Sequence, residues 1–391
     1  MSPFLPFDVI ALIIDIVGEN KDTDLLKRLA LVSHSFLQIC SKHLFATVKL
    51  HDDEFHVTSS KKAFIKLLRS RPDVVNYIRK LTYLVEYDNR SHPSESEDDR
   101  ILSNFLLTIS RLNCLTITGG GLYRDWNTPD SSLTSALLHL MHLPTINHID
   151  LSFIENFPLF SLTSSVNLHR LDINYLGLDS PEIVVPLEMM PKIREFHVSE
   201  SSLVATKLLH AKTQDGRPAF NFMDLRRFSI SLDRLEDIQI TRYILQNAKL
   251  LEKLRLILGW SDGSLVGLLS PSAHTLKALD LTVFLYQHFP LLAGVCEELE
   301  TMAGHNMLEA LSFEVYVGVH NTEDFIGRTI RKVENVLVKT GWSALRQVSF
   351  EVKSLEDDAK MFEALQSLPD KYLSQLSKLE SVAFSYSVSI V

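Results

Sequence analysis

The chain has 391 residues, of which 46% are hydrophobic and 22% charged. This composition supplies enough apolar side chains for a large core and argues against a globally disordered chain. The formal net charge of -9 argues against a nucleic-acid partner, because phosphate binding needs a basic surface. The three cysteines, Cys40, Cys114 and Cys296, lie far apart, so neither a disulfide framework nor a paired-cysteine metal site is expected.

The apolar run from Phe7 to Val17 differs from a signal peptide. No Lys or Arg precedes it, and Asp8 and Asp15 interrupt it. No other stretch is apolar for long enough to span a bilayer. We therefore expect no membrane partner and a protein of the cytoplasm or nucleus that is not secreted.

The first fifty residues predict three short helices. The first begins at Pro6, which costs no hydrogen bond in a first turn, and ends at Gly18. The second begins after Asp22 or Asp24, and the third begins at Ser33, all good N-cap residues. Because the first helix is apolar on more than one face, we expect a partner protein to cover part of it. The alternative is a helix buried inside one large fold.

These residues, from Leu5 to about Leu50, resemble an F-box. The shared features are a Leu-Pro opening, an apolar first helix, an acidic break, Asp-Leu, the string LALVS and a closing Leu-Phe. Phe36 stands where many F-boxes carry Trp, a departure that is common in the fungal branch that this sequence resembles. The resemblance implies contact with a Skp-type adaptor, and through it a cullin, by apolar residues at the matching positions. These are Leu5, Pro6, Val9, Ile10, Ile13, Leu25, Leu29, Val32 and Phe36.

The rest of the chain carries a degenerate repeat in which an apolar residue is followed by apolar residues three and five positions later. Successive copies begin 22 to 37 residues apart, and most have polar residues in the gaps, as in a strand that is buried on one face. The copies begin at Ile78, Leu112, Ile146, Leu168, Ile193, Leu225, Leu251, Leu276, Leu308, Leu345 and Leu379. Helical patterns separate several copies, for example at Ile238–Ala248 and Ala364–Leu376.

Alternating strands and helices with this pattern resemble leucine-rich repeats of irregular length. The expected fold class is α/β: a three-helix F-box at residues 1–50, followed at residues 51–391 by an irregular leucine-rich-repeat-like solenoid with parallel strands. The third apolar residue of each copy should lie in the core, with its two neighbours facing solvent. The polar, acidic segment Ser91–Arg100 is expected to be a loop.

Motifs of catalysis are missing from the sequence. It contains no GxSxG, HExxH or phosphate-binding GxxxxGK[ST] string. His139 and His142 share a helical spacing, with His148 nearby, but without a readable fourth ligand they are expected to be ordinary histidines. We therefore expect no catalytic residue, metal or cofactor. An enzyme with an unrecognised site remains the least favoured alternative.

The expected function is substrate recognition in a Skp-cullin-F-box ubiquitin ligase, with a target protein bound on the concave strands. A leucine-rich-repeat scaffold that works outside any ligase is the main alternative. Residues for target binding are expected at Arg170, His197, Arg227, Lys253 and Arg255. This basic group suits an acidic or phosphorylated segment, whereas later copies place Asp280, Glu314 and Glu351 at comparable positions. The alternative is solvated charge that pairs locally with Asp172 and Glu195.

Overall fold

The computed structural model describes residues 6–51, 60–85, 97–129, 131–177, 184–185, 191–259, 265–285, 291–318, 323–339, 341–355 and 359–391. The chain divides into two compact units. The first comprises Met1–Pro191 and Lys207–Phe220, and the second comprises Lys192–Thr206 and Asn221–Val391. The expected domain boundary after residue 50 stays a prediction. Among the described residues, no helix is long and apolar enough to cross a membrane.

The first unit begins with three short helices, as the sequence predicted: α1 (Phe7–Glu19), α2 (Thr23–Ala30) and α3 (His34–Leu44). The carboxylate of Asp22 accepts the backbone N–H of Leu25 at 3.0 Å, and the hydroxyl of Ser33 accepts that of Phe36 at 3.3 Å. Both side chains thus satisfy an N–H group that a helix start leaves without a partner. The prediction that these residues begin helices is confirmed.

The prediction that Gly18 ends the first helix is wrong, since α1 continues to Glu19. Gly18 has a different role. A side chain there would overlap the ring of His43, which lies directly against α1. In this position His43 Nε2 is 2.7 Å from Asp15 Oδ1, and Lys42 Nζ is also 2.7 Å from that oxygen. The hydrogen bond from Lys42 and then that from His43 lower the pKa of Asp15, so the carboxylate ties α1 to α3.

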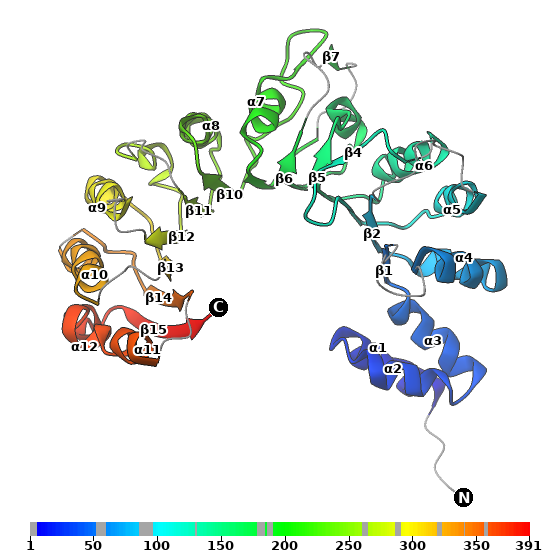
Figure 1. Cartoon of the computed structure of the whole chain (residues 1–391), viewed down its shortest axis with the longest axis horizontal. Helices are drawn as coiled ribbons and strands as arrows, with labels where there is room; N and C mark the ends of the chain where they lie inside the picture. Colours follow the sequence, from blue (N-terminus) through cyan, green and yellow to red (C-terminus); the bar gives the residue numbers. More distant parts are fainter. Residues whose placement is uncertain are drawn as a thin grey trace, which may run out of the picture. The chain divides into compact units, whose positions relative to one another are not determined.

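The first unit continues as parallel strands that alternate with helices (Figure 1). Its sheet has the order β1, β2, β3, β5 and β6, with β4 beside the end of β5. The strands are β1 (Thr47–Leu50), β2 (Lys80–Leu84), β3 (Cys114–Thr118), β4 (Arg124–Asp125), β5 (His148–Glu155) and β6 (Arg170–Leu176). Between them lie α4 (Ser60–Ser70), η1 (Pro72–Tyr77), α5 (Glu97–Leu106), α6 (Ser131–Met141) and η2 (Leu159–Ser164). A separate pair joins β7 (Val184–Val185) to β9 (Lys212–Thr213).

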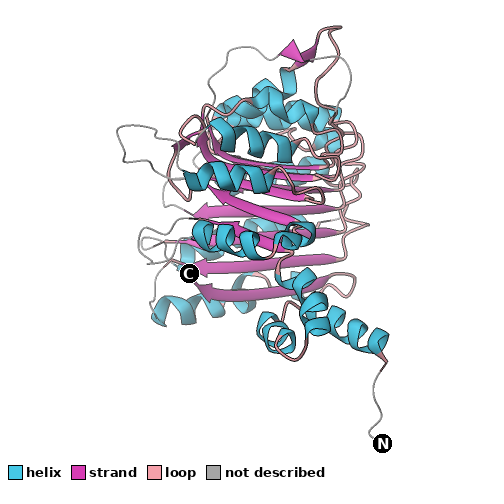
Figure 2. Cartoon of the chain, turned by 90° about the vertical axis from the view of Figure 1, so that its right-hand side faces the viewer, coloured by secondary structure: helices cyan, strands magenta, loops and turns pink. Residues whose placement is uncertain are grey.

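The second unit repeats the same alternation, and its strands run parallel in chain order. They are β8 (Glu195–Ser199), β10 (Arg227–Leu232), β11 (Lys253–Leu258), β12 (Ala278–Leu285), β13 (Ala310–Val317), β14 (Gln347–Ser354) and β15 (Ala383–Ile390). Helices cover one face of these strands: α8 (Leu235–Asn247), η3 (Ser270–Ser272), α9 (Leu291–Met302), α10 (Glu323–Leu337), α11 (Ala359–Gln366), α12 (Leu368–Tyr372) and η4 (Leu376–Lys378). One further helix, α7 (Ser202–His210), follows β8. Figure 2 shows the strands edge to edge with helices packed over them.

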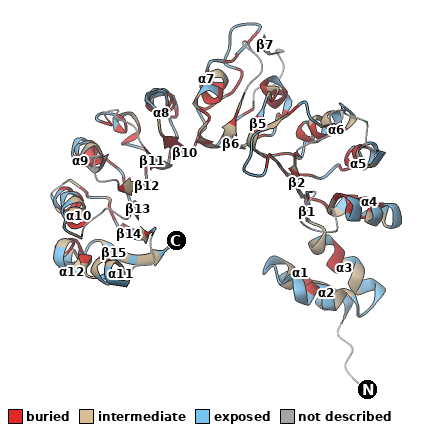
Figure 3. Ribbon diagram, viewed as in Figure 1, coloured by how far each residue is buried: buried red, intermediate tan, exposed pale blue. Residues whose placement is uncertain are grey.

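The core of both units lies between the strands and the helices, where the buried residues gather (Figure 3). Every predicted pattern start from Ile78 to Leu345 is at most 1% exposed, and only the last, Leu379, is partly exposed. The third apolar positions are also buried, except Phe384, which is half-buried on the last strand. The buried ones are Leu151, Ile173, Val198, Ile230, Leu256, Leu281, Phe313 and Phe350. An α/β, solenoid-like fold with parallel strands is therefore confirmed.

Three sequence expectations need correction. The neighbours of the third apolar positions do not all face solvent, because Asp172, Ser231 and Thr282 are buried among side chains of adjacent strands. Glu97 begins α5, so the end of the predicted loop is helical, with acidic residues in the first turn where the helix dipole favours them. The start of that loop lies outside the described residues. Thr47–Leu50 forms β1, which pairs with β2, although the repeat pattern begins only at Ile78 and predicted no strand there.

Candidate functional site

The three N-terminal helices expose many apolar side chains around a very small core. Ile14, Leu26 and Cys40 are the buried centre, and partly buried residues pack against it. The large apolar side chains that remain exposed are Phe7, Val9, Leu12, Ile13, Ile16, Leu25, Leu31 and Val32. Exposure reaches 88% at Leu31 and 64% at Val32, in the turn between α2 and α3. We call these eight residues the N-terminal apolar surface.

The residues predicted to contact an adaptor separate into two groups in this arrangement. Val9, Ile13, Leu25 and Val32 belong to the N-terminal apolar surface, and Pro6 is exposed beside it. Ile10, Leu29 and Phe36 pack against the small core instead. Leu5 lies outside the described residues. Sequence reasoning did not select Phe7 or Leu31 for this contact, although both are apolar, with Phe7 in the first predicted helix and Leu31 directly after the second.

The second candidate is the strand face opposite the helices, here called the open face. Parallel register places its side chains in rows across the second unit. One row contains His197, Ser229, Arg255, Asp280, Ser312, Ser349 and Ser385, and the next contains Ser231, Ile257, Thr282, Glu314, Glu351 and Ser387. A polar surface therefore runs along the strands, as the period of two predicted.

The predicted target-binding cations lie on the open face, but carboxylates pair with them. In the second unit Arg227 lies 3.3 Å from Glu195, Lys253 lies 2.7 Å from Asp280, and Arg255 lies 2.9 Å from Glu314. In the first unit, Arg170 lies 2.8 Å from Asp172. His197 shares its row with Arg255. The expected basic groove is thus a surface of alternating charge, in which the local pairs with Asp172 and Glu195 do form.

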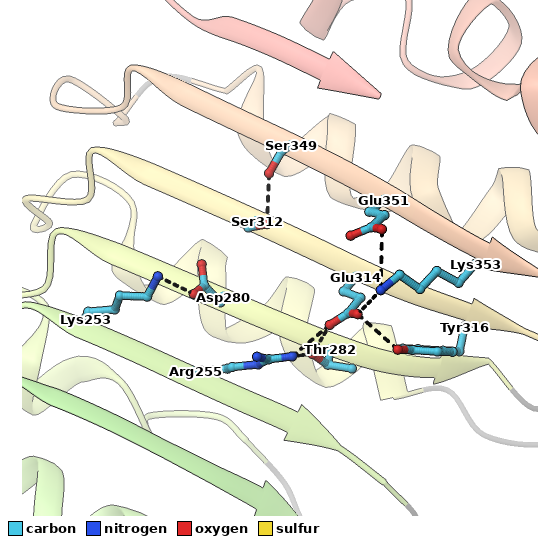
Figure 4. Close-up of polar contacts among 10 residues, drawn as sticks. All are labelled: Lys253, Arg255, Asp280, Thr282, Ser312, Glu314, Tyr316, Ser349, Glu351 and Lys353. Carbon is cyan, nitrogen blue, oxygen red and sulfur yellow. Dashed lines mark hydrogen bonds and ion pairs between the residues drawn. The ribbon is translucent and has the colours of Figure 1, made fainter. Parts of the chain in front are cut away.

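Glu314 is the centre of a polar cluster on this face (Figure 4). Its carboxylate accepts hydrogen bonds from Arg255 and Thr282 at 2.9 Å each, from Tyr316 at 3.0 Å and from Lys353. Burial by itself would raise the pKa of Glu314. The hydrogen bonds from these donors have the larger combined effect, so the pKa of Glu314 is lowered. The bond to Glu314 in turn raises the pKa of Lys353. The cluster is an ionised, internally satisfied network that links β11, β12, β13 and β14.

A small apolar cavity lies under the second unit's strands. Its volume is about 10 Å³, room for about one water molecule. Leucine side chains and Glu298 line it. The Glu298 carboxylate accepts the backbone N–H groups of Gly267 and Leu269, while burial raises its pKa. This glutamate therefore holds a turn in place, and the cavity is too small for a substrate.

The histidines of the first unit take separate partners. His142 Nε2 lies 2.9 Å from the carbonyl oxygen of Ser161, whereas His148 contacts Cys114 and Asp172. Across the described part of the chain, no three His, Cys, Asp or Glu side chains form a group that could hold a metal ion. Neither the models of known protein families nor the curated proteins match this chain. The function is therefore inferred from the residues and their geometry.

Proposed function

We propose that this chain is the substrate-recognition subunit of a Skp-cullin-F-box ubiquitin ligase. In this proposal α1, α2 and α3 bind a Skp-type adaptor, and through it a cullin, while the repeats bind a target protein. The ubiquitin chemistry belongs to other subunits, so the chain itself needs no catalytic residue. Its proposed location is the cytoplasm or the nucleus, where such ligases work.

The observation that carries this proposal is the N-terminal apolar surface. Phe7, Leu12 and Ile16 of α1 are each at least half exposed, and Leu31 and Val32 are more exposed still. Several large apolar side chains left exposed on a small helical unit commonly mark a protein interface. Two of the three helices that carry this surface begin at N-cap residues that the sequence predicted, Asp22 and Ser33. An adaptor would bury these side chains and complete a core that three short helices cannot fill.

The open face supports the second half of the proposal. Its cations are 46% to 63% exposed in the second unit, so a partner can reach them, but each already has a carboxylate neighbour. A bound target must therefore match alternating charges and cannot rely on negative charge alone. This pattern favours a specific folded surface or peptide over a generic polyanion.

The proposal is tested by mixing the purified full-length chain with a purified Skp-type adaptor and following the two by size-exclusion chromatography. We expect them to elute together as one complex. A second sample, with a cullin added, should give a larger complex that requires the adaptor. If the chain elutes alone while its repeats still capture protein partners, the scaffold function replaces the ligase function.

A further inference from the structure

Three side chains from three strands of the first unit form a chain of polar contacts on the open face. Cys114 Sγ on β3 lies 3.2 Å from His148 Nδ1 on β5, and His148 Nε2 lies 3.0 Å from Asp172 Oδ2 on β6. Arg170 also donates to Asp172, with its Nη2 at 2.8 Å from the same oxygen. The histidine ring is thus held at both nitrogens between a sulfur atom and a carboxylate.

The parallel register explains why these residues meet. Cys114 is opposite His148, and His148 is opposite Arg170. Cys114, His148 and Arg170 therefore lie in one row, with Lys80 of β2 beside Cys114. The next row on the same face contains Thr116, Asp150 and Asp172. The charged or titratable groups that face the histidine are therefore Lys80, Cys114, Asp150, Arg170 and Asp172.

The surroundings favour a protonated histidine. Burial works against the charge, but the hydrogen bonds to Asp172 and Cys114 outweigh it and raise the pKa of His148 to about 9. At neutral pH both ring nitrogens then carry a proton, one donated to the carboxylate and the other to the sulfur. A donor cation beside a cysteine stabilises its thiolate, the form that reacts with electrophiles.

We propose that Cys114 is a redox modification site, with His148 as the residue that activates its sulfur and Asp172 as the residue that positions His148. The co-reactant is a hydroperoxide, of which hydrogen peroxide is the simplest. The thiolate sulfur attacks one peroxide oxygen, the O–O bond breaks, and a new S–O bond forms. The sulfur is oxidised to a sulfenic acid, and the peroxide is reduced. The leaving hydroxide takes the proton from His148 Nδ1 and departs as water.

The other two cysteines provide internal controls. Cys40 and Cys296 are both buried, with 0% and 8% of their surface exposed, whereas Cys114 is partly exposed on the open face. Burial raises the pKa of Cys40, and it raises the pKa of Cys296 to about 11. Both should therefore stay as unreactive thiols under conditions in which Cys114 reacts. The inference goes beyond the proposed function and stands whether or not an adaptor binds.

The first test is alkylation of the folded full-length chain with iodoacetamide between pH 6 and 9, with each cysteine followed by peptide mass spectrometry. An ordinary thiol is only about 1% ionised at pH 6.5. A hydrogen bond from a protonated histidine favours the reactive thiolate, and the lower basicity of such a sulfur removes part of the gain in rate. We therefore expect Cys114 to react about tenfold faster at pH 6.5 than it does in His148→Gln. The variant His139→Gln changes an exposed histidine and should react like the wild type.

The second test treats the wild-type chain with hydrogen peroxide and traps sulfenic acid with dimedone. Dimedone should label Cys114 and leave Cys40 and Cys296 unlabelled. The wild-type pH profile remains decisive even if a variant fails to fold. A reaction of Cys114 that rises only near the pKa of an ordinary thiol, about 8.5, overturns the proposal. So does equal reactivity in the wild type and in a folded His148→Gln.

Discussion

Arg255 of β11 donates to Glu314 of β13 at 2.9 Å, so the pair spans the strand between them. Thr282 of that intervening strand, β12, donates to the same carboxylate oxygen. Only 19% of the Glu314 side chain is exposed, whereas 46% of the Arg255 side chain is exposed. The carboxylate is therefore the structural element of the pair, and the guanidinium remains available at the surface.

Glu314→Gln should lower the free energy of unfolding by about 1–3 kcal/mol, because it weakens several charge-assisted hydrogen bonds at once. Arg255→Gln should cost less than about 1 kcal/mol, since the arginine is nearly half exposed. Urea unfolding followed by circular dichroism measures both values. Glu351→Gln is the matched control, because this glutamate of β14 is 47% exposed and contacts Lys353 at 3.4 Å. Equal losses for Glu314→Gln and Glu351→Gln would contradict the central role of Glu314.

His148 predicts a pH dependence of stability. Its folded pKa, about 9, exceeds the ordinary value of 6.5, so the folded chain holds a proton that the unfolded chain releases. The stabilisation is complete below pH 6.5 and is lost as the pH rises through 9. Urea unfolding of the wild-type chain between pH 6 and 10 should show this decline.

In the otherwise wild-type chain, His148→Gln should remove the decline, and Asp172→Asn should move it to lower pH, because the carboxylate no longer favours the imidazolium. An unchanged decline in His148→Gln would assign the pH dependence to another group. The same variants also serve the oxidation tests, so that stability and reactivity are measured on identical proteins.

Two helical glycines should respond in opposite directions to alanine. Gly18→Ala places a methyl group in the ring of His43 and should displace that ring from Asp15, so we expect a loss of stability. Gly294→Ala in α9 meets only Leu265 at 3.9 Å, an ordinary contact, and should stabilise by about 0.5–1 kcal/mol through the better helix propensity of alanine. Thermal unfolding of each variant decides the signs. If Gly18→Ala stabilises the protein instead, the contact between His43 and Asp15 does not depend on the close approach of the ring to Gly18.

Much of the repeat architecture could be predicted from sequence, because a strand buried on one face leaves a period of two and each core position needs a large apolar residue. This signal correctly placed residues from Ile78 to Leu345 in the core. It worked less well at the ends. Phe384 lies on β15, an edge strand of the sheet formed by the described residues, where it is only half-buried, and β1 is too short to show the full pattern.

Apart from the pairs with Asp172 and Glu195, the side-chain partners could not be predicted, because they depend on register between distant strands. Lys253 and Asp280 are 2.7 Å apart only because β11 and β12 pair in this register. The same is true of Cys114, His148 and Asp172, which no sequence motif connects. Sequence reasoning weighed His148 only as a metal ligand, and the signal it lacked was the alignment of three parallel strands.

The proposed adaptor binding would use exposed apolar side chains, so variants can distinguish that proposed interface from the core. Ile13→Ala changes a side chain that is 46% exposed, and Ile14→Ala changes one that is 1% exposed. The first should weaken the adaptor complex without changing thermal unfolding. The second should lower the stability of the helices by about 2–5 kcal/mol through the cavity it leaves. Leu250→Ala, at 45% exposure in the second unit, should change neither property.

The most direct measurement is the dissociation constant of the full-length chain for a purified Skp-type adaptor, determined by isothermal titration calorimetry for the wild type and for Ile13→Ala. The account predicts saturable one-to-one binding by the wild type and a loss of about 1–3 kcal/mol of binding free energy in Ile13→Ala, roughly 5- to 150-fold in affinity. No detectable binding by the folded wild-type chain would contradict the ligase function.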